Sequence, residues 1–226
     1  MVGSSVGRGW TPAGADFARR HPALAFRPFG LGKVGAWDLK ARISHEDVDG
    51  GNYLSSSGDG TRPALLAGPL PRAPRRVETL GTDSAGYRSA VAAFLANHGL
   101  AGARFEIARA VRADLDGDGT QEVLLEARSG PGLDAASSAS APKGAFSLVL
   151  LRFVSPRGVS QVPLEFSRLG EDAPLELRRI RAIADVDGDG SMEIVTGVKG
   201  FEWQDATLWS YRRGVARRLV TNGAGV

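Results

Sequence analysis

The chain has 226 residues, of which 42% are hydrophobic and 23% charged, a balance typical of a globular protein and not of a disordered one. It contains no cysteine, which excludes disulfides, thiol catalysis and zinc sites built on cysteine, and no apolar run approaches the ~20 residues of a transmembrane helix. The formal net charge is +3, but eight of the 25 acids lie in two short loops, so the rest of the chain carries +11. Because the arginines are scattered, without interleaved aromatic residues, we expect a solvated basic surface, and nucleic acid is not favoured as a partner.

Residues 1–68 are predicted to be a weakly structured segment, because its aromatic residues are spread among Pro and Gly. One strand is predicted around Gly35–Ile43, and the Ser/Gly-rich stretch Gly50–Gly60 is predicted to be an exposed loop. His45–Gly50 looks like a degenerate acidic loop, since it lacks the third Asp and the sixth-position Gly of the two loops described below. The segment could therefore hold a degenerate copy of the repeat that follows.

Residues 69–82 form a connector rich in Pro and Arg, which we expect to be an extended tether because its three prolines disfavour regular helix or sheet. A helix is predicted at the start of residues 83–226, with Asp83 or Ser84 as its cap and Gly99 as its stop. Its apolar stripe, at three- and four-residue spacing, consists of Tyr87, Ala90, Val91, Phe94, Leu95 and His98.

Beyond residue 103 the apolar period changes to two, which predicts strands. Two units, about 103–168 and 175–221, each contain a strand, an acidic loop, a second strand and a hairpin, so each predicts about four antiparallel strands. The first strand is expected to place four apolar side chains on one face, namely Phe105, Ile107, Val111 and Leu115. The other predicted strands are Val123–Ala127, Phe146–Val154, Val159–Phe166, Leu175–Ala184, Ile194–Val198, Ala206–Tyr211 and Val215–Thr221.

The two acidic loops, Asp114–Glu122 and Asp185–Glu193, start 71 residues apart and carry the same residue types at the same offsets. Hard oxygen ligands on a tight loop suit Ca²⁺, which binds about six to eight oxygens, better than Mg²⁺, which keeps its waters. Without a cation, two like charges ~4 Å apart repel by about 4 kcal/mol at an effective dielectric constant of about 20. The candidate ligands are Asp114, Asp116, Asp118, Thr120 (through its carbonyl) and Glu122 in the first loop, and Asp185, Asp187, Asp189, Ser191 (through its carbonyl) and Glu193 in the second.

Other interpretations of these loops require different surroundings. A turn that binds nothing is the simplest one, and two copies with the same offsets disfavour it. An EF-hand requires flanking helices and Glu at position 12, where this chain has Leu125 and Thr196 inside strand-like runs. A phosphatase of the haloacid dehalogenase type also begins with Asp-x-Asp-Gly, but it uses one such motif per domain in a parallel sheet. Here the motif occurs twice, and the segments that follow it are predicted to be antiparallel hairpins.

The loops resemble the calcium loops of FG-GAP and VCBS repeats, which occur in integrin-like β-propellers and in many bacterial surface proteins. Both fit the Asp-x-Asp-x-Asp-Gly-x-x-acid pattern, with Glu where the family usually has Asp or Asn. The resemblance implies calcium ligands at the first, third, fifth and last positions of each loop. The stretch from about Leu70 to Val226 also looks like a group of bacterial exported proteins without an established activity, through Pro71–Pro74, Asn97–Gly99 and Ser147–Arg152 among other motifs. This likeness implies an extracytoplasmic or secreted address, while the residues alone leave a cytoplasmic one open.

These features predict a mainly β (α+β) protein with two antiparallel four-stranded units that resemble propeller blades, each with a calcium loop, and one helix N-terminal to them. Two units cannot close a propeller, which needs at least about four blades. The two sheets can instead pack face to face, residues 1–68 can supply a third unit, or chains can associate, so the oligomeric state is left open.

We expect a calcium-binding, non-catalytic module with a structural or partner-binding role at the cell envelope or outside the cell. The sequence contains no nucleophile elbow, P-loop or dinucleotide fingerprint. Trp203, Trp209 and Tyr211 follow the second loop, and core packing is the default for them, with a surface for a protein or carbohydrate partner as the alternative. The alternative function is a metal-dependent phosphoester hydrolase, in which Arg112 and Arg181 beside the loops would bind an anionic substrate.

Overall fold

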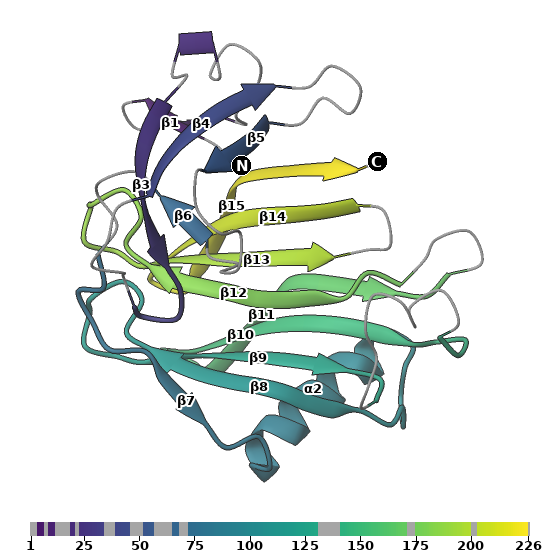
Figure 1. Cartoon of the computed structure of the whole chain (residues 1–226). Helices are drawn as coiled ribbons and strands as arrows, with labels where there is room; N and C mark the ends of the chain where they lie inside the picture. The colour runs from purple at the N-terminus through teal and green to yellow at the C-terminus, as the bar shows by residue number, and fades with distance from the viewer. Residues whose placement is uncertain are drawn as a thin grey trace.

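A computed structural model describes residues 4–6, 9–11, 19–20, 23–33, 39–45, 52–56, 65–67, 72–130, 141–170, 175–199 and 203–225. In these residues the chain is mainly β. Two large antiparallel sheets pack against each other, with the helix α2 at one end and a smaller N-terminal sheet at the other (Figure 1). The predicted fold class is confirmed, and neither large sheet closes into a barrel. Among the described residues, no helix is both long and apolar enough to span a bilayer.

The first large sheet contains the first predicted unit and one strand from the connector. Its strands lie in the order β11-β10-β9-β8-β7. The helix α2 (Ala85–Asn97) falls between β7 and β8 in the chain, with Ser84 at its N-cap and Gly99, at φ 74°, just after its C-cap. Both ends match the prediction, although the Ser84 side chain makes no capping hydrogen bond. The strands are β7 (Glu78–Leu80), β8 (Glu106–Ala113), β9 (Glu122–Arg128), β10 (Phe146–Ser155) and β11 (Gly158–Arg168).

The second large sheet contains the second predicted unit, with its strands in chain order. All the strands predicted beyond residue 103 are present, with ends shifted by a few residues. In each unit the acidic loop joins the first strand to the second, namely β8 to β9 and β12 to β13. The strands of this sheet are β12 (Arg178–Ala184), β13 (Glu193–Lys199), β14 (Trp203–Arg212) and β15 (Val215–Gly225).

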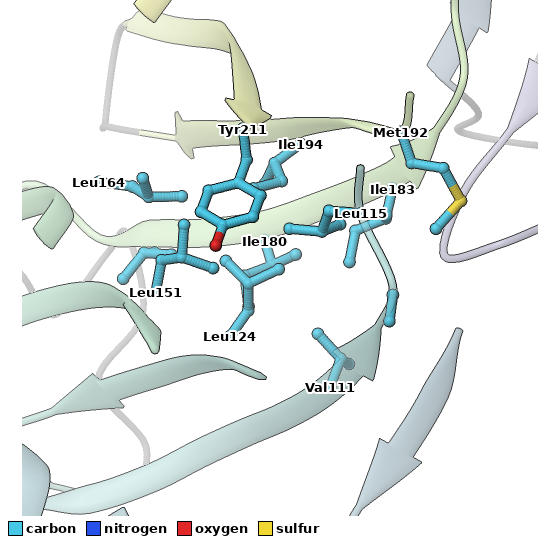
Figure 2. Close-up of a cluster of buried hydrophobic side chains, with 12 residues drawn as sticks. Val111, Leu115, Leu124, Leu151, Leu164, Ile180, Ile183, Met192, Ile194 and Tyr211 are labelled. Atoms are coloured by element: carbon cyan, nitrogen blue, oxygen red, sulfur yellow. The ribbon is translucent and has the colours of Figure 1, made fainter. Parts of the chain in front are cut away.

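Three clusters of buried apolar side chains join the layers. The helix-side core lies between the first sheet and α2, where Val91, Phe94 and Leu95 are buried as the predicted stripe requires. The outer core lies on the far face of the second sheet, against Trp10 and Phe29 of the N-terminal segment. The central core lies between the two sheets, as Figure 2 shows. It consists of Val111, Ala113, Leu115, Leu124, Val149, Leu151, Leu164, Ile180, Ile183, Met192, Ile194 and Tyr211.

The two units stack front to back. Val111 and Leu124 of the first unit belong to the central core, whereas the residues 71 positions later, Ala182 and Val195, belong to the outer core. The face that the first sheet turns to the second is therefore the same face that the second sheet turns to the N-terminal segment. Stacked repeats are arranged in this way, with atypical elements capping the ends of the stack. Here α2 and the N-terminal segment are the two caps.

Strand β8 corrects one prediction, because its apolar side chains do not share one face. The pairing of β8 with β9 shifts between Ile107 and Arg109. A bulge adds one residue to a strand, so the alternation of side chains inverts beyond it. Ile107 accordingly packs with Ala110 in the helix-side core, while Val111 and Leu115 pack in the central core.

Residues 1–68 contain more regular structure than predicted. The expected strand Gly35–Ile43 overlaps β4, but β5 lies inside the stretch expected to be a loop. Three of these strands, β1, β2 and β6, have only three residues each, and β6 pairs with the distant β3, so local composition does not reveal them. Residues 46–51, which hold most of the degenerate acidic loop, lie outside the described part of the chain. β1 (Ser4–Val6) pairs with β2 (Gly9–Thr11), and β3 (Ala23–Phe29), β4 (Leu39–His45), β5 (Asn52–Ser56) and β6 (Leu65–Ala67) form a sheet in the order β5-β4-β3-β6.

Candidate metal centres

The first Asp of each acidic loop folds the loop around its own carboxylate. Asp114 Oδ1 accepts a hydrogen bond from the Gly117 N–H at 2.8 Å, and its Oδ2 accepts one from the Gly119 N–H at 3.2 Å. The equivalent bonds in the second loop, from the fourth- and sixth-position glycines to Asp185, measure 2.6 and 3.1 Å. All four glycines have φ between 76° and 90°, a left-handed conformation that explains why glycine stands at these positions.

The Glu at the end of each loop is buried. Glu122 and Glu193 begin β9 and β13 and are each 2% exposed. Glu122 Oε2 accepts a hydrogen bond from the Leu115 N–H at 2.9 Å, and Glu193 Oε2 accepts one from the Val186 N–H at 3.0 Å. Burial, reinforced by the Asp charges of the same loop, raises the pKa of Glu122 to about 7 and that of Glu193 to about 8. Both carboxyls thus lie where a negative charge is costly unless a cation accompanies it.

Three carboxylates converge in each loop. One oxygen each from Asp114, Asp116 and Glu122 lie within 4.8 Å of one another, and the same holds for Asp185, Asp187 and Glu193. Within the first group, Asp116 Oδ1 is buried and has no hydrogen-bond partner. In the second group, burial is the main cause that raises the pKa of Asp187. A divalent cation would offset the repulsion and supply a partner for the buried oxygen, so the two groups could hold metal ions.

Of the four remaining candidate ligands, the two Asp side chains face solvent, while Thr120 and Ser191 are half-buried. The side chains of Asp118 and Asp189 are exposed and stay outside the two groups of three. Each caps the backbone two residues on, since its Oδ1 accepts the N–H of Thr120 or Ser191 at 2.7 Å. The structure therefore brings together the first, third and last carboxylates of each predicted set and leaves the fifth-position carboxylate facing solvent.

The first loop also contacts the second sheet. Asp116 Oδ2 accepts a hydrogen bond of 2.7 Å from the N–H of Arg213, in the turn between β14 and β15. Among the described residues, Arg213 is the one non-glycine with a positive φ, at 48°. Burial, together with the charge of Glu122, raises the pKa of the nearby Tyr211 hydroxyl. The first centre thus lies at the boundary between the two units.

Arg75, which sequence reasoning missed, joins the two loops. Its Nε donates to the carbonyl of Asp114 at 2.5 Å, and its Nη2 donates to the carbonyls of Leu115 at 3.0 Å and Gly190 at 2.7 Å. A backbone hydrogen bond of 2.7 Å from the Met192 N–H to the Leu115 carbonyl joins the loops a second time. No local spacing could have identified Arg75, because its partners lie 39 to 115 residues away.

The connector that carries Arg75 is docked on the loops and does not act as a free tether. Arg72 and Asp185 exchange two backbone hydrogen bonds, of 2.7 and 3.0 Å, and Asp185 is 1% exposed. The end of the connector forms β7, whose Glu78 pairs with Arg112 of β8. Both centres are therefore held by the chain segment that precedes the helix.

Of the three aromatic residues named after the second loop, the structure describes the side chains of Trp209 and Tyr211, and both pack on the central core. Tyr211 is 3% exposed in the central core (Figure 2). Trp209 packs against the same core and donates its Nε1–H to Thr196 Oγ1 at 2.9 Å. The side chain of Trp203 lies outside the described part. Trp209 and Tyr211 therefore pack on the central core, as the default expectation has it, and a partner surface that includes them stays a prediction.

Comparison with family models, with curated proteins and with solved structures finds no match. The resemblance to FG-GAP and VCBS repeats therefore stays a prediction from the loop residues.

Proposed function

We propose that this chain is a calcium-binding, non-catalytic module in which two Ca²⁺ ions fix the loops joining β8 to β9 and β12 to β13. One observation carries the proposal: two loops 71 residues apart each gather three carboxylates at the same offsets, with a buried Glu at the start of the next strand. A repeated arrangement of this kind is hard to explain by turn geometry alone, because the one backbone hydrogen bond that each Glu accepts needs only a neutral acceptor and gives no reason for three converging carboxylates.

The donor atoms favour Ca²⁺ over other cations. All the candidate ligands are oxygen donors, and among the described residues no histidine joins either group, which disfavours zinc and other transition metals. Ca²⁺ accepts about six to eight oxygens in irregular geometry, whereas Mg²⁺ demands an octahedron and retains waters. The exposed fifth-position Asp and the seventh-position carbonyl of each loop are the further ligands that this coordination number calls for.

The proposed role of calcium is structural. At ~1 mM calcium and a Kd of ~10 μM, each site would add about 2.7 kcal/mol to the free energy of unfolding. That contribution is large beside the 5–15 kcal/mol of a typical domain, about a fifth or more of the total. Calcium of this concentration is found outside the cytoplasm, which agrees with the address expected at the cell envelope or outside the cell, where the module would bind a protein or carbohydrate partner.

The hydrolase alternative finds less support. It needs a free cationic side chain next to an open coordination position. Arg112 is paired with Glu78, and the charges that act on Arg181 are those of Arg179, Glu126 and Arg109, not those of the second acidic loop. Arg75, beside the first loop, is likewise occupied by three carbonyls. The antiparallel sheets also differ from the parallel sheet in which the Asp-x-Asp-Gly phosphatases hold their nucleophile.

The test is thermal unfolding in excess EDTA, in millimolar Ca²⁺ and in millimolar Mg²⁺, for the parent chain and for Asp116→Asn combined with Asp187→Asn. Asparagine keeps the shape of each side chain and an acceptor for the Arg213 amide. We expect a large rise in Tm that is specific to Ca²⁺ and is lost in the double variant. Asp83→Asn, an exposed acid before the helix, is the matched control and should respond to Ca²⁺ as the parent does.

Two outcomes would contradict the proposal. Ca²⁺ and Mg²⁺ could raise Tm equally, which would indicate screening of charge and not a selective site. Alternatively, the double variant could keep the full response, which would place the calcium elsewhere. If EDTA causes no change at all, elemental analysis of the purified protein decides between a tightly held metal and loops that bind none.

A further inference from the structure

The two acidic loops are in direct backbone contact. The Met192 N–H donates to the Leu115 carbonyl at 2.7 Å, and both side chains are fully buried in the central core (Figure 2). The Met192 N–H belongs to the same peptide group as the Ser191 carbonyl, which is a candidate ligand of the second centre. The Leu115 N–H in turn donates to Glu122 Oε2, in a candidate ligand of the first centre. Two hydrogen bonds through Leu115 therefore connect a candidate ligand of one centre to a candidate ligand of the other.

The connector makes further contacts that span the two loops. Arg75 donates to carbonyls of both loops, and Arg72 exchanges two backbone hydrogen bonds with Asp185, the first residue of the second loop. All these bonds are made to the backbone of the loops, so they depend on how each loop is folded. The docked position of the connector therefore requires the folded shape of both loops at once.

Each loop is less stable in its closed shape when it holds no cation. Closing gathers three carboxylates within 4.8 Å, and like charges at such distances repel. Ordering the connector against the closed loops also costs conformational entropy. The first ion to bind bears this cost and the second does not, since the connector is already in place. Two sites that share one ordering step in this way bind with positive coupling.

We propose that the connector, residues 72–76, is a latch that couples the two centres, so that Ca²⁺ fills them with positive cooperativity. This inference rests on the proposed function, because it needs an ion in each loop. Repulsion between the two ions opposes the coupling, but salt screens exposed charges beyond about 8–10 Å and leaves the hydrogen bonds of the latch in place. Coupling between sites is typically about 5- to 150-fold, and we expect about tenfold here.

The first experiment is calcium titration by calorimetry of the parent chain and of two variants that each disable one loop, Asp116→Asn and Asp187→Asn. The coupling factor is the product of the two association constants of the parent divided by the product of the single constants of the two variants. This factor is about 10 with the expected coupling and about 1 for independent sites, even where the loops differ in intrinsic affinity.

The same factor is then measured with Arg75→Met and with Arg76→Met in all three chains. Arg75→Met removes the donors that both loops share, so the factor should fall to about 1–3, with the Met192–Leu115 bond still joining the loops. Arg76→Met is the matched control, because the Arg76 side chain is 83% exposed and pairs with Glu78. Its coupling factor should stay at about 10.

Limited digestion of the parent chain with trypsin tests the latch without any substitution. Trypsin cleaves after Arg72, Arg75 and Arg76, and the connector should be cut about tenfold faster or more in EDTA than in millimolar Ca²⁺. Arg157, exposed in the turn between β10 and β11, is the internal control, and cleavage there should not depend on calcium. The digestion is run well below the Tm in EDTA, so that global unfolding contributes to neither rate.

Three results would overturn the latch and leave the proposed function standing. The first is two Ca²⁺ ions that bind the parent with a coupling factor of about 1 or less. The second is an equal fall of the factor in the Arg75 and Arg76 variants. The third is a connector that trypsin cuts at the same rate with and without calcium. A titration in which no calcium binds would instead overturn the proposed function, and the latch with it.

Discussion

Arg75 is the side chain that both acidic loops share, since its guanidinium donates to carbonyls of each. Arg75→Met keeps most of the aliphatic volume and removes the donors. We expect a loss of about 2 kcal/mol in the free energy of unfolding and a lower calcium affinity at both loops, because charged hydrogen bonds of this kind contribute about 1.5–3 kcal/mol. Denaturant unfolding and calcium titration measure the two effects.

Arg76→Met is the control for this prediction, because the Arg76 side chain is 83% exposed and pairs only loosely with Glu78, at 3.5 Å. It should change stability by less than about 0.5 kcal/mol. If both variants behave alike, Arg75 holds neither loop.

The buried Glu193 gives a pH dependence with a defined sign. Its pKa is raised from 4.5 to about 8, so the folded chain without metal binds a proton that the unfolded chain releases. The stability that comes from this proton is present below pH 4.5 and is lost as pH rises through about 8, by up to about 1.4 kcal/mol per pH unit. Unfolding in urea with EDTA, at several pH values, should show this decline in the parent chain and a smaller one in Glu193→Gln.

At the scale of the residue, the sequence predicted the site residues that contact one another within a single loop. The carboxylates of each loop lie within nine positions, so their convergence could be inferred from spacing alone. The contribution of Arg75 could not be inferred from spacing. The contact from Arg213 to Asp116 could not be inferred either, because the two residues are 97 positions apart. Both depend on how the two units stack.

At the scale of the element, each acidic loop is a strand connection that requires two left-handed glycines. Gly119 and Gly190 have φ of 88° and 90°, and a Cβ at either would meet no atom within 4 Å. Alanine there should therefore be costly through backbone conformation and not through a clash, by roughly 1–2 kcal/mol each. Thermal unfolding of Gly119→Ala and Gly190→Ala measures this cost, and calcium titration reports whether the loop still closes.

Gly130 provides the comparison for this pair. A Cβ at Gly130 would also meet no atom within 4 Å, but its φ is not positive, so Gly130→Ala should be nearly neutral. An equal loss of Tm in all three variants would mean that the left-handed conformation is not what the loops require.

Strand existence was predictable beyond residue 103 because alternation and turn residues agree there. Which face of a strand each side chain occupies was harder to predict, because the bulge in β8 at residue 108 places Ile107 and Val111 in different cores. In residues 1–68 three strands have only three residues each and the pairing of β3 with β6 is remote, so composition underestimated the regular structure there.

At the scale of the whole molecule, a buried ionic cluster joins the two sheets. Arg178 of β12 pairs with Asp205 of β14 at 3.0 Å and with Glu165 of β11, in the other sheet, at 3.6 Å. Arg178→Met would leave these carboxylates without their cation in a site where all three side chains are less than 15% exposed. We expect a loss of about 3–5 kcal/mol, measured by denaturant unfolding.

Arg179→Met is the neighbouring control and should cost less than about 1 kcal/mol, because no ion pair of Arg179 is found among the described residues. A small effect of Arg178→Met would show that the central core alone holds the sheets together.

The front-to-back stacking of the two units has a consequence for assembly. In the first sheet, the face that α2 covers is equivalent to the face that the second sheet packs against the first. In the second sheet, the face that the N-terminal segment covers is equivalent to the face that the first sheet packs against the second. A contact between unlike faces can repeat, so molecules stripped of both covers would add to one another head to tail, into a ring where the rotation per unit closes and into an open filament where it does not. The helix and the N-terminal strands therefore cover two faces that are complementary to each other, and so keep the stack at two units.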